Sequence, residues 1–337
     1  MDAALNEIAR ALVAPGKGIL AADESSGTIK KRFDAIGTES TEDRRRAYRE
    51  MLFTAKGAEE CISGVILYDE TIRQTASDGR PLVKVLEDAG IMPGIKVDKG
   101  TTKLAKSPHE LVTDGLDGLR ERLVEYRGLG AKFAKWRAVI TIGDGIPTQY
   151  CLDVNAHALA RYAALCQDEG IVPIVEPEVL MDGGHTIERC FDVTRDTLHT
   201  VFDELFAQQV ELEGMLLKPN MVVPGKANRT ASPDEVADAT LTCFREVVPA
   251  AVPGIVFLSG GQDDVEATAN LDAINKRGPH PWEVSFSYGR ALQAAALKAW
   301  GGSDANADAG RAAFLHRAKM NSLARYGKWS PDAENAA

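Results

Sequence analysis

The side chain best suited to covalent chemistry in this sequence is Lys218, which follows the apolar run 215–217 and precedes Pro219. A lysine at the end of a buried segment is partly removed from water, and this desolvation disfavours its ammonium form. A neighbouring cation such as Lys135 acts in the same direction and leaves a neutral amine, which can attack a ketone. A buried lysine that only pairs with Glu176 predicts the same contact, so both interpretations stay open.

Other charged side chains also lie at the ends of short apolar runs. Glu176 and Glu178 alternate on one strand, so both can face the same side of it and pair with Lys135 and Arg137. Any one such residue is usually a solvated loop residue. A buried unpaired charge costs several kcal/mol, however, so charges in apolar runs must form ion pairs or serve a function. Their coincidence therefore favours a catalytic cleft. The set comprises Asp23, Glu24, Asp69, Glu70, Lys96, Asp98, Lys99, Lys135, Arg137, Glu176, Glu178 and Lys218.

Two glycine-containing segments near the C-terminal end suit a phosphate group. Backbone N–H groups of Gly260 and Gly261, after Ser259, can approach an anion at the start of a helix. The triplet alone is weak, because most such triplets are turns, but Gly289 and Arg290 follow the next run and the guanidinium can bind a phosphate through two hydrogen bonds. A second phosphate is expected at another cationic set, which comprises Lys31, Arg32, Lys96 and Arg137. For Lys31 and Arg32, an exposed helix start is an equally good explanation.

The segments that must hold these residues are eight short runs rich in β-forming residues, each followed by a helical stretch. They span 18–22, 64–68, 94–97, 132–136, 171–175, 215–217, 255–258 and 284–287. Continuous apolar runs are typical of strands buried on both faces, and their alternation with helices indicates a parallel sheet. Helix signals between them include the capping box 232–235 and Gly170, which ends the helical stretch 155–169.

Eight such units without a linker predict a (β/α)8 TIM barrel, which builds its site at the C-terminal ends of its strands. The alternative is an open doubly wound sheet, which is disfavoured because no G-x-G-x-x-G motif follows the first run. We expect a single barrel domain over residues 1–330 and a flexible C-terminal tail over residues 331–337.

Composition restricts the class of protein. The chain has 337 residues and a net charge of −10, which argues against a nucleic-acid or anionic-membrane binder but not against a phosphorylated substrate in a cleft. Five scattered cysteines without a C-x-x-C pair predict reduced thiols. The N-terminus lacks the features of a signal peptide, and no apolar run approaches the roughly 18 residues of a membrane span. We expect a cytoplasmic protein, although a plastid origin after loss of a transit peptide stays open.

Metal centres and serine nucleophiles find little support. The six histidines are scattered without a pair at ligand spacing, and His185 with Glu188 lies in a glycine-rich loop, where a turn is the better explanation. No Gly-x-Ser-x-Gly motif occurs in the chain. We therefore expect no metal and no other cofactor.

The sequence resembles the class I fructose-bisphosphate aldolases in seven segments, which occur in the same order over about residues 5–330. They are 18–25, 93–100, 133–137, 173–178, 216–221, 257–262 and 286–290. The resemblance implies a (β/α)8 barrel, a homotetramer and a reaction without a metal. It further implies reversible cleavage of fructose 1,6-bisphosphate to dihydroxyacetone phosphate and glyceraldehyde 3-phosphate, in glycolysis and gluconeogenesis.

The resemblance also implies roles for individual residues. Lys218 matches the Schiff-base lysine, and Glu176 matches the acid–base group that helps to dehydrate the carbinolamine, with Glu178 beside it. Asp23 matches the carboxylate that handles the proton of the C4 hydroxyl, and Lys135 matches the cation that polarises the site. Other matches are Lys96 and Arg137 as substrate contacts, Ser259, Gly260, Gly289 and Arg290 at one phosphate, and Thr28 and Arg32 near the other.

One departure concerns the C-terminal end. Many animal members end in a mobile tail with a final tyrosine that assists proton exchange, whereas no tyrosine follows Tyr326 here. The preference for bisphosphate over monophosphate substrates and the enamine protonation step therefore stay open. A related Schiff-base aldolase acting on sedoheptulose bisphosphate or another ketose phosphate is the alternative, and a catalytically silent binding protein is a third possibility.

Overall fold

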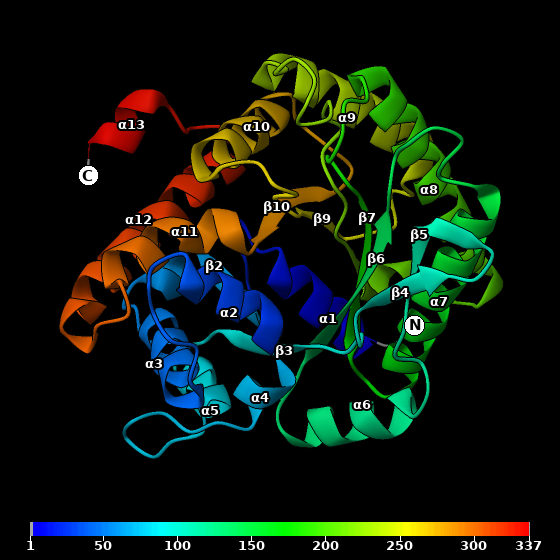
Figure 1. The fold of residues 1–337 in the computed structure, drawn as a ribbon. Helices are drawn as coiled ribbons and strands as arrows, with labels where there is room; N and C mark the ends of the chain where they lie inside the picture. The colour runs from blue at the N-terminus through cyan, green and yellow to red at the C-terminus, as the bar shows by residue number, and fades with distance from the viewer. Residues whose placement is uncertain (1–2, 337) are drawn as a thin grey trace.

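A closed barrel of eight parallel strands forms the centre of the computed structural model, which describes residues 3–336 (Figure 1). Around the barrel the strand order is β1-β10-β9-β8-β7-β6-β3-β2. The strands are β1 Gly18–Ala22, β2 Ile62–Leu67, β3 Met92–Lys96, β6 Phe133–Ile140, β7 Val172–Val179, β8 Leu216–Leu217, β9 Gly254–Phe257 and β10 Glu283–Tyr288. Each expected run overlaps one of these strands. The predicted (β/α)8 barrel is confirmed, and the open doubly wound alternative is wrong because the sheet closes on itself.

Helices surround the barrel (Figure 1). They are α2 Ser26–Asp34, α3 Glu42–Phe53, α4 Asp69–Ile72, α5 Leu82–Asp88, α6 Leu119–Gly128, α7 Gln149–Asp168, α8 Ile187–Ala207, α9 Pro233–Val247, α10 Asp264–Lys276, α11 Arg290–Trp300 and α12 Ala307–Arg325, with short 3-10 turns at Ala58–Glu60, Leu212–Gly214 and Asp304–Asn306. The predicted capping box of Ser232 and Glu235 starts α9, as expected. Helix α7 begins earlier than predicted because the Thr148 side chain caps it.

Side chains inside the barrel change character along the strands. Phe133, Ile174 and Leu216 belong to one apolar cluster in the lower part of the interior. Because successive strand residues point to opposite faces, the next inward-facing residue lies two positions further along each strand. On β6, β7 and β8 these next residues are Lys135, Glu176 and Lys218. The same pleat that fills the lower core thus directs charged groups into the upper part of the barrel.

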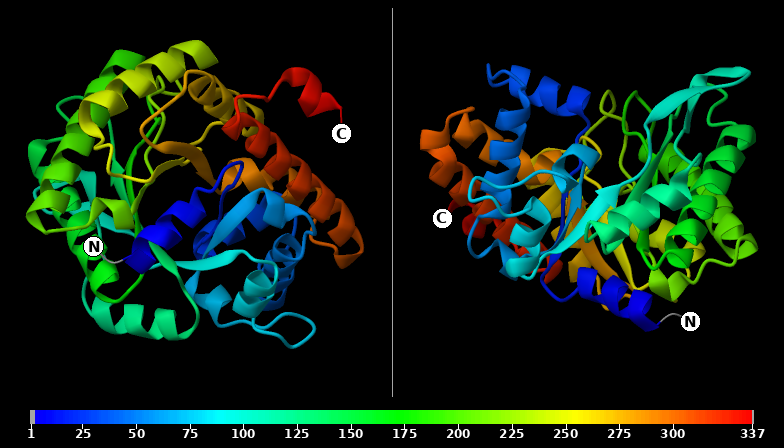
Figure 2. Two further views of the ribbon diagram at one scale, coloured as in Figure 1. Left: turned by 180° about the vertical axis from the view of Figure 1, so that it is seen from behind. Right: turned by 90° about the horizontal axis from the view of Figure 1, so that it is seen from below.

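Helix α1, Ala3–Leu12, closes the barrel at the N-terminal ends of its strands. Leu5, Ala9 and Leu12 are buried and belong to the same apolar cluster as the lower barrel interior. Figure 2 shows α1 and the β4–β5 hairpin at opposite ends of the barrel. The described residues therefore seal the barrel at its N-terminal end by apolar packing, and its cavity opens at the C-terminal end.

The antiparallel hairpin of β4 Thr101–Leu104 and β5 Ser107–Thr113 was not expected from the sequence. It is largely polar, so it has no continuous apolar run. Its anchor is Glu110, which is 1% exposed and accepts hydrogen bonds from the Thr148 backbone and hydroxyl, both at 2.7 Å. The Thr113 hydroxyl donates to the Arg137 carbonyl at 2.7 Å. The hairpin therefore supports the end of β6 beside the barrel mouth.

The segment expected to be a flexible tail begins as a short helix, α13 Pro331–Asn335. Glu334 accepts hydrogen bonds from Arg317 Nη1 and Trp329 Nε1, both at 3.0 Å, and its Oε1 lies 3.2 Å from His316 Nε2. Mobility of the tail stays a prediction, and Ala337 lies outside the described residues. The five cysteines are free and buried. Among residues 3–336, no helix is both long and apolar enough to span a bilayer.

Candidate active site

A cavity of about 1220 Å³ opens at the C-terminal ends of the barrel strands. Every residue to which the sequence assigned a role in the site lines it, although each role stays a prediction. Glu70, which was expected among the strand-end charges of the cleft, is not part of the lining and pairs with Arg45 instead. From β1 and α2 come Asp23, Thr28 and Arg32; from β3, β6, β7 and β8 come Lys96, Lys135, Arg137, Glu176, Glu178 and Lys218; from the segments after β9 and β10 come Ser259, Gly260, Gly289 and Arg290. Residues from distant parts of the sequence therefore meet in one space.

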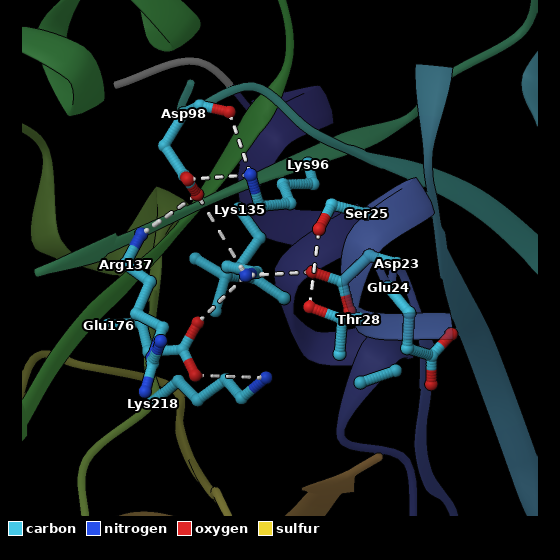
Figure 3. A network of polar contacts seen from close by, with 12 residues as sticks. Asp23, Glu24, Ser25, Thr28, Lys96, Asp98, Lys135, Arg137, Glu176 and Lys218 are labelled. Carbon is cyan, nitrogen blue, oxygen red and sulfur yellow. Dashed lines mark hydrogen bonds and ion pairs between the residues drawn. The ribbon is translucent and has the colours of Figure 1, made fainter. Parts of the chain in front are cut away.

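Four buried or nearly buried groups form a continuous line of alternating charge in this cavity. The Nζ atom of Lys218 lies 3.2 Å from Glu176 Oε1, and the Nζ atom of Lys135 lies 3.2 Å from Glu176 Oε2. Lys135 Nζ also lies 2.8 Å from Asp23 Oδ2. Figure 3 shows Glu176 between the two lysines and Asp23 on the far side of Lys135. Glu176 is thus shared, with one oxygen for each ammonium group.

The two lysines differ in how many carboxylates surround them. Lys135 faces Asp23, Glu176 and, at 3.9 Å, Asp98, whereas Lys218 faces Glu176 alone among residues 3–336. Burial by itself would lower the pKa of Lys135, but these three carboxylates raise it well above its ordinary value. Lys135 is therefore a fixed cation, and Lys218 is the lysine with one carboxylate within 4 Å among the described residues.

Asp23 is correspondingly held as a carboxylate. Burial alone would raise its pKa, but the positive charges of Lys135 and Lys218 and the hydrogen bond from Lys135 hold that pKa well below its usual range. A carboxylate that stays ionised inside a cavity can accept a proton from a bound hydroxyl group only transiently. Asp23 can therefore hold such a proton briefly, next to the permanent cation Lys135.

A second cluster surrounds Asp98, which follows β3 and is buried. Its Oδ1 atom lies 2.6 Å from Lys96 Nζ, and its Oδ2 atom accepts a hydrogen bond from the Arg137 backbone N–H at 3.3 Å. The Arg137 side chain contacts Glu178, as the alternation of β7 predicted. Asp98 thus fixes two candidate substrate contacts. Asp98 was expected among the strand-end charges but without a function, and its spacing of two from Lys96 is the signal in the sequence that could have indicated this pairing.

Behind the cavity, Glu24 connects the start of α2 to the helix layer. It contacts the Arg32 guanidinium and accepts a hydrogen bond from Gln293 Nε2 at 2.8 Å. Arg49, which is 1% exposed, donates to the Glu24 carbonyl at 2.9 Å. This network holds Arg32 at the rim. Arg49 could not be predicted, because its place in a helix with several arginines indicates an exposed residue.

The glycine-containing segments lie together as expected. Gly260 has a φ of +56° and Gly261 a φ of +102°, in the loop between β9 and α10. Arg290 begins α11 directly after β10 and has no ion-pair partner among residues 3–336. The Ser287 hydroxyl also lines this cavity, is buried and has no hydrogen-bond partner within the described chain. It ends the expected run 284–287, but no role was predicted for it. Donors for an anion therefore gather on this side of the cavity.

No group of three or more His, Cys, Asp and Glu side chains is placed to hold a metal ion within the part of the chain that the structure describes. His185, considered above with Glu188, lies in the loop before α8, where burial lowers the pKa of its imidazole.

Comparison with known proteins identifies a family. Residues 4–337 match the family model described as "Fructose-bisphosphate aldolase class-I". Over 328 residues the chain is 57% identical to a "Probable fructose-bisphosphate aldolase class 1" of Xanthomonas campestris pv. campestris, covering 96% of this chain and 98% of the relative. It is 53% identical over 321 residues to "Fructose-bisphosphate aldolase 6, cytosolic" of Arabidopsis thaliana, covering 95% and 90% of the two chains.

A solved structure resembles the whole fold. The fructose-bisphosphate aldolase of Plasmodium falciparum, determined in complex with TRAP and a small-molecule inhibitor, matches with a TM-score of 0.96 and 50% sequence identity. The match covers 97% of this chain and 95% of the other. The names of these relatives lend no support to the sedoheptulose bisphosphate alternative. The family match over nearly the full length and relatives at 53% and 57% identity lead to one conclusion: the chain belongs to the class I fructose-bisphosphate aldolases.

Proposed function

We propose that this aldolase cleaves fructose 1,6-bisphosphate reversibly through a Schiff base between Lys218 and the C2 ketone of the substrate. The observation that carries the proposal is the contact of Lys218 Nζ with a carboxylate that is shared with a second, permanently charged lysine. Of the two buried amines in the cavity, Lys218 has a single carboxylate within 4 Å among residues 3–336, and Lys135 has three. Lys218 is therefore the better nucleophile.

In the first half of the reaction, Glu176 moves protons next to Lys218. Its Oε1 atom is within 3.2 Å of the amine, a distance from which it can accept the ammonium proton before attack. The neutral amine adds to C2 and forms a carbinolamine. Glu176 then returns a proton to the C2 hydroxyl, which leaves as water, and an iminium forms on Lys218.

In the second half, the iminium accepts the electron pair of the breaking C3–C4 bond. Asp23 accepts the proton of the C4 hydroxyl, and glyceraldehyde 3-phosphate leaves with a new carbonyl group. Protonation of the remaining enamine at C3 and hydrolysis of the iminium release dihydroxyacetone phosphate and restore the amine. Lys135, which touches both Asp23 and Glu176, stabilises the carboxylate forms of these two groups throughout.

Two groups of anion donors support a bisphosphate as the substrate. Ser259, Gly260, Gly289 and Arg290 are proposed to bind one phosphate, and Thr28 and Arg32, with Lys96 and Arg137 as further substrate contacts, the other. Both groups line the same cavity as Lys218, so a single extended sugar can reach all three.

A turnover assay with product identification tests the proposal. The protein should convert fructose 1,6-bisphosphate to both triose phosphates at an unchanged rate in EDTA. Lys218→Ala should lower kcat by at least about 10³-fold, because the variant lacks the amine that forms the imine. Lys298→Ala, an exposed lysine on α11, is the matched control and should retain full activity. Activity that survives in Lys218→Ala and disappears in EDTA contradicts the mechanism.

We also infer a homotetramer in the cytoplasm, as the family resemblance implies. The Arabidopsis relative named cytosolic supports the location. Light scattering after size-exclusion chromatography tests the assembly, with a mass four times that of the 36.3 kDa chain as the expected result. A monomer or dimer at micromolar concentration contradicts it.

A further inference from the structure

We propose that Lys226 is a further anion-binding residue of this aldolase, which contacts the substrate phosphate bound at Ser259, Gly260 and Arg290. The inference rests on the proposed function, because it takes that phosphate site as given. Lys226 lies outside the barrel strands, in the loop between β8 and α9, and it lines the same cavity as the glycine segment.

The backbone around Lys226 is fixed by a neighbouring loop. The β8–α9 loop lies along the β7–α8 loop through three backbone hydrogen bonds: Lys226 N–H to the Met181 carbonyl at 2.8 Å, Ala227 N–H to the Gly183 carbonyl at 2.9 Å, and Gly225 N–H to the His185 carbonyl at 2.9 Å. A Cβ atom on Gly225 would lie 2.3 Å from the Gly183 carbonyl oxygen, so this approach requires glycine. Lys226 is therefore held at a defined place on the rim.

The side chain of Lys226 extends over the phosphate-site glycines. A Cβ atom built on Gly261 would lie 2.6 Å from Lys226 Nζ and 2.7 Å from its Cε. The ammonium group thus occupies the space directly above the Gly261 backbone. An anion that accepts hydrogen bonds from the N–H groups of this segment lies within reach of the ammonium.

The charge of Lys226 is available to a ligand. Among residues 3–336 its carboxylate partner is Asp182, at 3.4 Å, and the two side chains are 46% and 66% exposed. An ion pair this exposed contributes little. The cations of the opposite group are satisfied more firmly, since Lys96 lies 2.6 Å from the buried Asp98 and Arg32 contacts the buried Glu24. Lys226 can therefore exchange its contact with Asp182 for one with a phosphate at little cost in free energy.

A lysine at the rim, away from the reacting carbons, acts on binding and not on the chemical step. Removing it should weaken the bound substrate and the transition state equally, which raises KM and leaves kcat unchanged. Because the group is half-exposed, salt should reduce its contribution.

The test compares Lys226→Met with Arg229→Met, which removes a positive charge from the same loop. The Arg229 guanidinium lies 2.8 Å from Glu235 and is exposed. For Lys226→Met we expect KM for fructose 1,6-bisphosphate and the inhibition constant of inorganic phosphate to rise about tenfold at low salt, with kcat within about twofold of the parent. Both increases should shrink at high ionic strength. Lys226→Arg should restore most of the binding, and Arg229→Met should match the parent.

Borohydride trapping of dihydroxyacetone phosphate, at saturating concentration, separates the two levels of the proposal. If the parent protein and Lys226→Met both form the Lys218 adduct, but phosphate inhibits Lys226→Met and Arg229→Met equally well, the role of Lys226 is overturned and the Schiff-base mechanism stands. If the parent forms no adduct on Lys218, the proposed function itself fails. Melting temperatures of both variants identify any loss of folding.

Discussion

The barrel interior has two layers that use the same strands for opposite purposes. The lower layer is apolar and is closed by α1: Ile19, Ala21, Ile66, Phe133, Val172, Ile174, Leu216 and Val256. The upper layer is charged and faces the cavity: Asp23, Lys96, Lys135, Arg137, Glu176, Glu178 and Lys218. On several strands a single step of two residues separates them. Stability and chemistry are therefore assigned to different depths of one barrel, and variants in the two layers should have opposite effects.

The largest expected effect on activity comes from Lys218→Met in the upper layer. Turnover should fall by at least about 10³-fold, because the imine cannot form. The free energy of unfolding should stay within about 1 kcal/mol of the parent, since Glu176 keeps Lys135 as its partner and a buried charge is replaced by an apolar group. Urea denaturation measures the free energy of unfolding, and a turnover assay on the same sample measures kcat. A large loss of stability would contradict the separation of the layers.

The converse variant is Phe133→Ala in the lower layer. Phe133 is fully buried, so its removal should lower the free energy of unfolding by about 3–5 kcal/mol. In the fraction that remains folded, kcat should change by less than about threefold, because Lys135 still lies on the same strand. Kinetics at low temperature, where the variant is folded, provide the check. A large drop in kcat there would show that the two layers are coupled.

Around the cavity, the two groups of anion donors should differ as well. Arg290 has no ion-pair partner among residues 3–336, whereas Arg32 contacts the buried Glu24. Arg290→Met should therefore raise KM for fructose 1,6-bisphosphate by about tenfold or more, and Arg32→Met by a smaller factor. Steady-state kinetics on the two variants at one salt concentration measure both KM values and show which increase is larger. The reverse order would mean that the Glu24 contact opens when substrate binds.

The smallest effect lies outside the barrel, at Glu334. Burial alone would raise its pKa, but hydrogen bonds from Arg317, Trp329 and His316 lower it below the ordinary 4.5. Its contribution of about 1 kcal/mol is then complete above pH 4.5 and is lost as the pH falls through the folded-state pKa. Glu334→Gln should be less stable than the parent at pH 7, and the difference should shrink below pH 4.5. A difference that is constant across this range would contradict the assignment.

The eight strands could be predicted because most of them are short apolar runs followed by a charged residue, and the last two are followed by glycine-containing segments. The position of these residues at the cavity follows from the barrel, whereas their roles stay predictions. The β4–β5 hairpin could not be predicted, because its strands are short and polar and its anchor, Glu110, is buried only in the folded chain. The same holds for Arg49, which is indistinguishable by sequence from its exposed neighbours.

Pairing within the site shows a similar limit. Alternation on β7 indicated that Glu176 and Glu178 share a face, and their contacts with Lys135 and Arg137 are found as expected. The spacing could not show that Lys135 collects three carboxylates, because Asp98 follows the neighbouring strand β3 and Asp23 follows β1, which lies two strands beyond β3 in the closed sheet. That difference between the two lysines depends on barrel closure.

The most direct test of the account is the position of a covalent adduct. Dihydroxyacetone phosphate and borohydride are added to the parent protein, and the reduced product is digested and mapped by mass spectrometry. The account predicts one adduct per chain, on Lys218, and none on Lys135, because the three carboxylates keep Lys135 protonated. An adduct on Lys135, or no adduct in a protein that still cleaves the substrate, would contradict it.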